Sequence, residues 1–66
     1  MAKFIKVHRH NAGKTNGMTV FVNIDAIQMI YHDIHHHENT LEFVEGSLWI
    51  AETPDCIIDM IKEVEK

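Results

Sequence analysis

The stretch TLEFVEGSLWIAETPDCIIDMIKEV, residues 40–64, decides the fold because it joins a β-hairpin directly to a helix. Apolar and polar residues alternate on both sides of Glu45-Gly46, which predicts two antiparallel strands over 40–44 and 47–51. The alternating apolar positions are Leu41, Phe43, Leu48 and Ile50. This is the clearest hairpin in the chain.

A helix signal follows the hairpin at once. The Thr53 hydroxyl can accept a first-turn amide, and Pro54 suits the first helical position, where its missing N–H costs nothing. Apolar residues then recur at helical spacing, at Ile57, Ile58, Ile61 and Val64. We therefore expect an amphipathic helix that docks this stripe on a sheet.

Two more strands are predicted nearer the N-terminus, over 3–9 and 18–23. In each strand, alternate positions place apolar residues on one face: Ile5 and Val7 in the first strand, Val20 and Val22 in the second. The residues between them, 11–17, include two Asn and two Gly, which is typical of a connecting loop. Asn23-Ile24-Asp25 predicts a turn, since Asn and Asp side chains bond to nearby backbone amides.

Residues 26–34, AIQMIYHDI, fit either a strand or a helix, and their content of Ile and Tyr favours a strand. The polar residues 35–39 then predict the turn of a hairpin. The expected fold class is α+β: a small antiparallel β-sheet of about five strands with one C-terminal amphipathic α-helix packed on one face. Residues 1–66 are expected to form a single domain.

Composition argues against several classes of function. The net charge is −4 with neutral His, whereas Lys and Arg drive binding to duplex nucleic acid. No stretch approaches about 20 apolar residues, and the first residues lack the apolar run of a signal peptide. Cys56 is the only cysteine, so a disulfide within the chain is impossible. We expect a cytoplasmic protein that binds neither nucleic acid nor membranes.

Histidine supplies the chemically suggestive cluster. His32, His35, His36 and His37 fall within six positions, with Asp33 and Glu38 beside them. Imidazole and carboxylate groups bind zinc, and alternate residues of a strand could reach one ion. An exposed polar turn is the simpler interpretation, because metal ligands need further hydrogen bonds to hold them. We therefore assign no metal or cofactor residue, and whether the cluster binds a metal stays open.

Signals of an enzyme are weak. Gly13-Lys14-Thr15 lacks the upstream Gly of a phosphate-binding loop. Cys56 falls in the first turn of the expected helix, but a buried or half-buried structural cysteine is the simpler interpretation. Trp49 is expected on the face opposite Leu48 and Ile50, either under the helix or on a contact surface. We assign no catalytic residue and expect that the protein is not an enzyme.

A series of short motifs runs through residues 3–64. They are Val22-Asn23-Ile24-Asp25-Ala26-Ile27, Ile30, Thr40-Leu41-Glu42-Phe43, Gly46, Trp49-Ile50 and Glu52-Thr53-Pro54 with Ile57 and Ile61. Together they resemble the FlbD-like small proteins, a flagellar and swarming-motility family with relatives in Bacteroidetes and phages. The resemblance implies the fold above and carries over no catalytic residue. Ile24 stands where the family pattern has Pro, and residues 32–39 are longer and richer in His than that pattern.

The chain more weakly resembles the LytTR DNA-binding domains, which have a similar order of strand, hairpin and helix. That family contacts DNA through basic loop residues. The matching loops here carry His36, Glu38 and Glu45, so the resemblance implies no DNA binding for this chain.

Both faces of the expected strands carry apolar residues. One face has Phe4, Phe21, Met29, Tyr31, Val44 and Trp49, and the other has Val7, Val20, Val22, Ile30, Phe43 and Ile50. One short helix covers one face, and a second copy is the simplest cover for the other. We expect an interaction or assembly protein that forms a homo-oligomer. The alternatives are a small motility-related regulatory protein that binds another protein, and a metal-binding module that uses His35 and His37.

Overall fold

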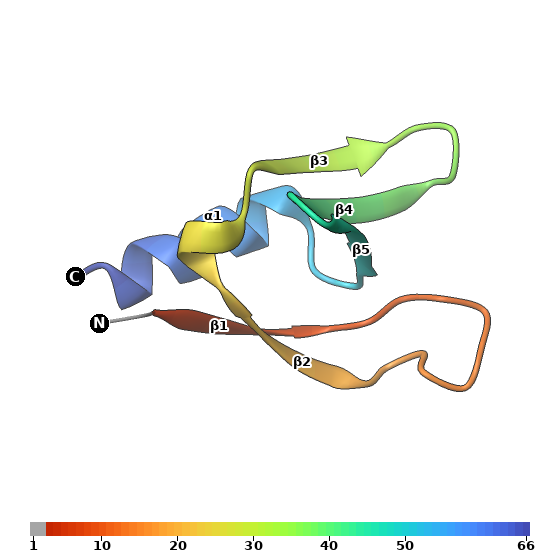
Figure 1. Ribbon diagram of the computed structural model, residues 1–66, viewed down its shortest axis with the longest axis horizontal. Helices are drawn as coiled ribbons and strands as arrows, with labels where there is room; N and C mark the ends of the chain where they lie inside the picture. Colours follow the sequence, from red (N-terminus) through yellow and green to blue (C-terminus); the bar gives the residue numbers. More distant parts are fainter. Residues whose placement is uncertain (1–2) are drawn as a thin grey trace.

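The computed structural model describes residues 3–66, and these form five strands, a short 3-10 turn and one α-helix (Figure 1). In chain order the elements are β1 (Phe4–His8), β2 (Thr19–Asn23), η1 (Ile24–Ala26), β3 (Met29–Asp33), β4 (Glu38–Phe43), β5 (Gly46–Ile50) and α1 (Pro54–Val64). The predicted α+β class, with five strands and a C-terminal helix, is confirmed. The strands divide between two antiparallel sheets, β1-β2 and β3-β4-β5.

The two sheets are joined where the C-terminal end of β1 meets β5. Arg9 and Ile50 form an antiparallel bridge there. On either side of it, the His10 N–H donates to the Trp49 carbonyl at 3.0 Å, and the Ala51 N–H donates to the His8 carbonyl at 2.9 Å. We call this contact between 8–10 and 49–52 the seam. It gives the β1-β2 hairpin a fixed position relative to the three-stranded sheet.

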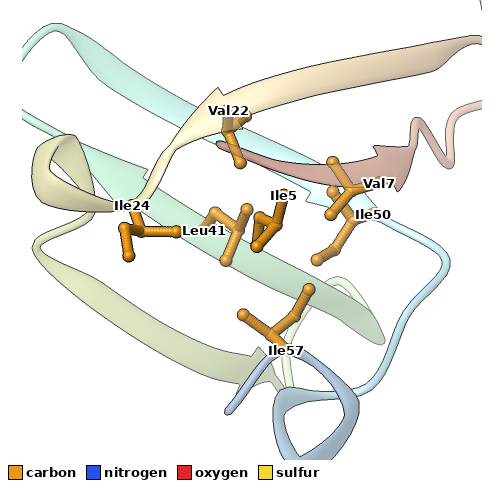
Figure 2. Packing of buried hydrophobic residues seen from close by; sticks show 7 residues of the cluster. All are labelled: Ile5, Val7, Val22, Ile24, Leu41, Ile50 and Ile57. Carbon is orange, nitrogen blue, oxygen red and sulfur yellow. The ribbon is translucent and has the colours of Figure 1, made fainter. Parts of the chain in front are cut away.

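The core lies between the inner faces of the two sheets and the helix. Its buried residues are Ile5, Val7, Val22, Ile24, Leu41, Ile50 and Ile57. Figure 2 shows their side chains converging from both sheets and from α1. The alternation predicted for the first strand is confirmed, because Ile5 and Val7 are buried while Phe4 and Lys6 are exposed.

The ambiguous segment before the hairpin is a turn followed by a strand. The Asn23 side chain accepts the Asp25 N–H at 3.0 Å, which starts the 3-10 turn. Ile24, at the position where the FlbD-like pattern has Pro, is buried in the core. Residues 29–33 then pair with β4, with Tyr31 opposite Thr40. The strand prediction for this segment is confirmed.

The helix begins as predicted but packs with a narrower face. The Thr53 hydroxyl accepts the Cys56 N–H at 3.2 Å, and Pro54 is the first helical residue. Ile57 is fully buried, and Met60, Ile61 and Val64 pack against the core, while α1 lies against β1 and β3. The prediction that Ile58 belongs to this stripe is wrong, since its side chain is 42% exposed. One residue beyond Ile57 is rotated by about 100° around a helix, which turns Ile58 away from the core.

The helix cap gives a first testable prediction. Replacing Thr53 with Ala is expected to lower the free energy of unfolding by about 1 kcal/mol, because the substitution removes one capping hydrogen bond while the freed amide can turn to water. Chemical unfolding followed by circular dichroism measures this loss, with Thr53→Ser as the control that keeps the hydroxyl. An equal loss in both variants would show that the hydroxyl is not the capping group.

Candidate interaction surfaces

The outer face of the β1-β2 hairpin combines aromatic and basic side chains. Phe4 is 52% exposed and Phe21 is 66% exposed, although both belong to paired strands. Lys6 lies directly opposite Phe21, and Phe4 is the next outward residue along β1. Diagonal neighbours on an antiparallel pair are close enough for aromatic side chains to touch. We call Phe4, Lys6 and Phe21 the basic face.

The outer face of the three-stranded sheet combines apolar and acidic side chains. Tyr31, Thr40 and Trp49 form one row across β3, β4 and β5, and Met29, Glu42 and Ser47 form the next row. Met29 is 55% exposed and Trp49 is 36% exposed, whereas Thr40 between Tyr31 and Trp49 is buried. We call Met29, Tyr31, Glu42 and Trp49 the acidic face. Trp49 thus lies on an outer surface and not under the helix.

Two of these residues are electrostatically linked. Partial burial, together with the neighbouring carboxylates of Glu42 and Asp33, raises the pKa of Tyr31. Tyr31 therefore remains a neutral donor at physiological pH. The Trp49 ring lies 5.2 Å from the His36 ring, centroid to centroid, so this surface offers aromatic, acidic and hydrogen-bonding groups side by side.

Charge is divided between the two halves of the chain. Residues 1–24 contain no Asp or Glu, and their basic residues are Lys3, Lys6, Arg9 and Lys14. Residues 25–61 contain no Lys or Arg. Their acidic residues are Asp25, Asp33, Glu38, Glu42, Glu45, Glu52, Asp55 and Asp59. Because the hairpin comes from the first half and the three-stranded sheet from the second, the two outer faces carry opposite charge.

The histidine cluster does not assemble into one site. Residues 34–37 form the β3-β4 turn, so His35 and His37 do not alternate along a strand as that hypothesis required. Asp33 organises the turn: its carboxylate accepts the backbone N–H groups of His35 and His36, at 2.9 and 3.1 Å, and it contacts the His36 ring at 2.9 Å. His37 takes a left-handed φ of 55°. Within residues 3–66, no three His, Cys, Asp or Glu side chains converge in a way that could hold a metal ion.

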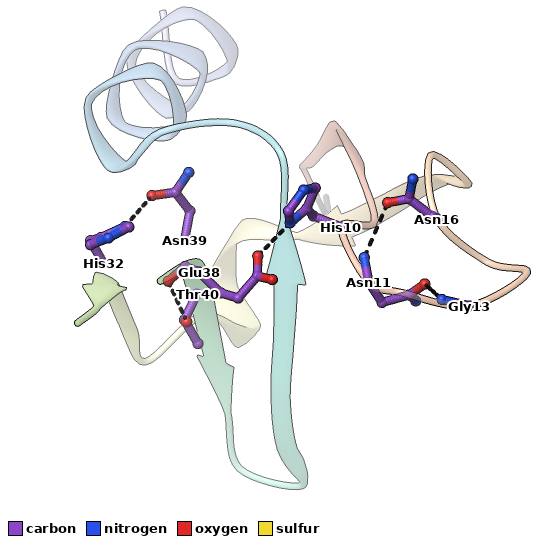
Figure 3. A network of polar contacts seen from close by, with 8 residues as sticks. All are labelled: His10, Asn11, Gly13, Asn16, His32, Glu38, Asn39 and Thr40. Atoms are coloured by element: carbon purple, nitrogen blue, oxygen red, sulfur yellow. Dashed lines mark hydrogen bonds and ion pairs between the residues drawn. The ribbon is translucent and has the colours of Figure 1, made fainter. Parts of the chain in front are cut away.

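Two histidines at the end of β1 and just beyond it contact carboxylates that are distant in the sequence. The His8 ring contacts the Glu52 carboxylate at 2.7 Å, and the His8 N–H donates to the same carboxylate at 3.0 Å. His10 contacts Glu38 at the start of β4, separately from the pair formed by His32 and Asn39 (Figure 3). The His8–Glu52 pair thus lies within the seam, and the His10–Glu38 pair links the segment after β1 to β4. No local spacing predicts these two pairs, because the partners lie 44 and 28 residues apart in the chain.

The His8–Glu52 pair predicts a dependence of stability on acid. Partial burial acts to raise the pKa of Glu52, but the hydrogen bonds from His8 outweigh burial and hold that pKa below its usual 4.5. A carboxyl with a lowered pKa in the folded state stabilises the fold above its unfolded pKa and loses that contribution as pH falls through the folded value. The pair should therefore contribute fully above pH 4.5 and progressively less below it.

Replacing Glu52 with Gln tests this. At pH 7 the variant is expected to have a lower thermal midpoint than the wild type. Between about pH 5 and pH 3 its thermal midpoint should decrease less than that of the wild type. Glu45→Gln, in the exposed β4-β5 turn, is the matched control and should follow the wild type. If Glu52→Gln and Glu45→Gln show the same pH dependence, the seam pair does not contribute to stability.

Concave regions lie beside these surfaces. A groove of about 360 Å³ runs between β1 and α1. Its lining includes Phe4, Lys6, Cys56, Asp59, Met60, Glu63 and Val64. The expectation of a buried or half-buried Cys56 is wrong, since Cys56 is exposed. Cys56 directly precedes Ile57, which faces the core, and so points away from it. A second concavity of about 250 Å³ lies beside the seam, between 9–11 and 47–49.

No helix in the described part of the chain is both long and apolar enough to cross a membrane. The sequence matches no protein-family model, and neither curated proteins nor solved structures show significant similarity to it. The FlbD-like and LytTR-like resemblances therefore stay predictions. Function has to be inferred from the surfaces of the chain itself.

Proposed function

We propose that this chain is a non-enzymatic assembly protein that forms a homo-oligomer through its outer sheet faces. The observation that carries the proposal is the exposure of large apolar side chains on paired strands: Phe4 at 52%, Phe21 at 66% and Met29 at 55%. The helix packs against the core, and these three side chains stay more than half exposed, Phe4 beside the groove between β1 and α1. Phe4 and Phe21 lie diagonally on one outer face and Met29 lies on the other, and exposed apolar patches are characteristic of protein–protein contact sites.

The size of the core supports association. Among residues 3–66 seven apolar residues are buried in the core, and a domain of about 60 residues buries only about 60% of the surface of its unfolded chain. Fully burying one Phe or Met side chain stabilises by about 1.5–3 kcal/mol. Association itself costs roughly 4–15 kcal/mol. Several aromatic and apolar side chains must therefore be buried together, which the two outer faces provide.

The alternative is a small regulatory protein that uses the same faces to bind a different protein, as the FlbD-like resemblance implies. Such a protein would be a monomer when purified, with Trp49 exposed at every concentration. The two functions thus differ in a property of the isolated chain.

Trp49 is the only tryptophan and reports on the acidic face. If that face becomes buried, the Trp49 emission maximum is expected to shift to shorter wavelength as the protein is concentrated from the low micromolar to the submillimolar range. Met18→Ser is a control that removes an exposed apolar side chain outside both named faces and should shift in the same way. An emission maximum that does not change with concentration would argue against self-association through this face.

A further inference from the structure

We propose that self-association pairs unlike faces: the basic face of one copy docks on the acidic face of the next. This inference rests on the proposed homo-oligomer and adds which surfaces meet. It also names the partner, a second copy of this chain.

Charge complementarity is the first argument. Lys6 stands between two exposed aromatic side chains on a hairpin whose residues 3–24 include no carboxylate side chain. Glu42 stands among Met29, Tyr31 and Ser47 on a sheet that carries no Lys or Arg. Opposite charges at the centre of two apolar patches guide encounter and fix register.

Several other charged groups near the two faces already have partners within the chain, while Asp59 and Glu63 of α1 line the same groove as Phe4 and Lys6. Glu52 reaches the end of the hairpin from the β5-α1 connection and is bonded to His8. On the sheet, Glu38 is bonded to His10 and Asp33 to His36. Lys6 and Glu42 form no ion pair within residues 3–66, so both remain available to a partner.

The apolar groups of the two faces are also complementary. Phe4 and Phe21 would meet Met29, Tyr31 and Trp49, which allows aromatic pairs and contacts between sulfur and an aromatic ring. The Lys6 ammonium group would approach both Glu42 and the aromatic rings around it. The faces of aromatic rings attract a cation. Pairing like faces would instead set Lys6 against Lys6 or Glu42 against Glu42, and like charges at an interface oppose association.

The fold determines what such a contact builds. The inner faces of the two sheets meet in the core, so the basic and acidic faces lie on opposite sides of it (Figures 1 and 2). A contact between unlike faces leaves one free face at each end of a pair. Contacts of this heterologous type close into rings or extend into filaments, and they do not stop at a two-fold dimer.

Charge reversal with mixing tests the pairing. Lys6→Glu makes both faces acidic, and Glu42→Lys makes both faces basic. Each variant alone is expected to associate more weakly than the wild type, by roughly one to three orders of magnitude in dissociation constant. An equimolar mixture is expected to recover association, because each variant then supplies the face that the other lacks. Sedimentation velocity measures the three samples at equal total concentration.

Matched controls carry the same charge changes away from the faces. Lys14→Glu lies in the β1-β2 loop and Glu45→Lys in the β4-β5 turn, and both positions are exposed. These variants should associate as the wild type does. Glu42→Gln serves where Glu42→Lys fails to fold, since it removes the charge and keeps the shape; it should also associate more weakly.

The outcomes separate this inference from the proposed function. A wild type that associates, with single variants that dissociate and a mixture that recovers, supports the pairing of unlike faces. A wild type that associates while Lys6→Glu and Glu42→Lys leave association unchanged, or while their mixture does not recover, overturns the pairing and leaves the homo-oligomer standing. A wild type that stays monomeric overturns both.

Discussion

Replacing Ile57 with Ala is expected to lower the free energy of unfolding by about 2–5 kcal/mol, the largest effect of any single substitution considered for this chain. Ile57 is fully buried and is the helix residue that reaches the core between the two sheets (Figure 2). The loss combines the transfer free energy of the removed methyl and methylene groups with the cavity left beside the sheets. Folded domains have only about 0.05–0.15 kcal/mol of stability per residue, so for a chain of 66 residues the loss is a large fraction of the total.

The neighbouring isoleucine supplies the control. Ile58 has the same side chain and the same helix but is 42% exposed, so Ile58→Ala is expected to cost about 1 kcal/mol or less. Urea unfolding followed by circular dichroism compares the two variants directly. Equal losses at the two positions would mean that α1 is not docked through Ile57, and the arrangement of the helix between the sheets would be wrong.

Replacing Phe4 and Phe21 together with Ser is expected to abolish self-association while the fold is kept. Both side chains are more than half exposed, so the change removes little of the core. In an interface they would be central aromatic contacts, and truncating a residue of that kind costs about 2 kcal/mol or more. The double variant should therefore dissociate more readily by roughly two orders of magnitude or more.

Val44 provides the comparison for this double variant. The expectation that Val44 shares a strand face with Phe4 and Phe21 is wrong, because Val44 lies in the turn between β4 and β5 and is 78% exposed, away from the two named faces. Val44→Ser should leave the mass in solution unchanged, and both proteins should keep the circular dichroism spectrum of the wild type. A folded double variant with wild-type mass would show that the β1-β2 face takes no part in association.

Local signals predicted most of the individual elements. Thr53 and Pro54 mark the helix start because capping depends on neighbours in sequence. Alternation identified which residues of each strand face inward, as Ile5 and Val7 against Phe4 show. The same alternation assigns the apolar residues to two strand faces without any knowledge of strand pairing. The expectation that one face is covered by a second copy could therefore be formed from the sequence.

Contacts between distant residues were not predictable in this way. Alternation does not say which strands pair, so the division into two sheets and the bridge between Arg9 and Ile50 carry no local signal. The predicted apolar stripe of the helix was also too broad: sequence periodicity includes Ile58, but α1 packs on the core through the face centred on Ile57 and leaves Ile58 42% exposed. The bond of His8 to Glu52 depends on the seam in the same way.

Molar mass in solution tests the central claim, self-association through the outer faces, most directly. Sedimentation equilibrium of the wild type over a wide concentration range is expected to give a weight-average mass that rises above the 7.7 kDa of the single chain. The mass should fall again at high salt, since part of the attraction is between exposed charges that salt screens. A mass that stays at 7.7 kDa throughout would contradict the account.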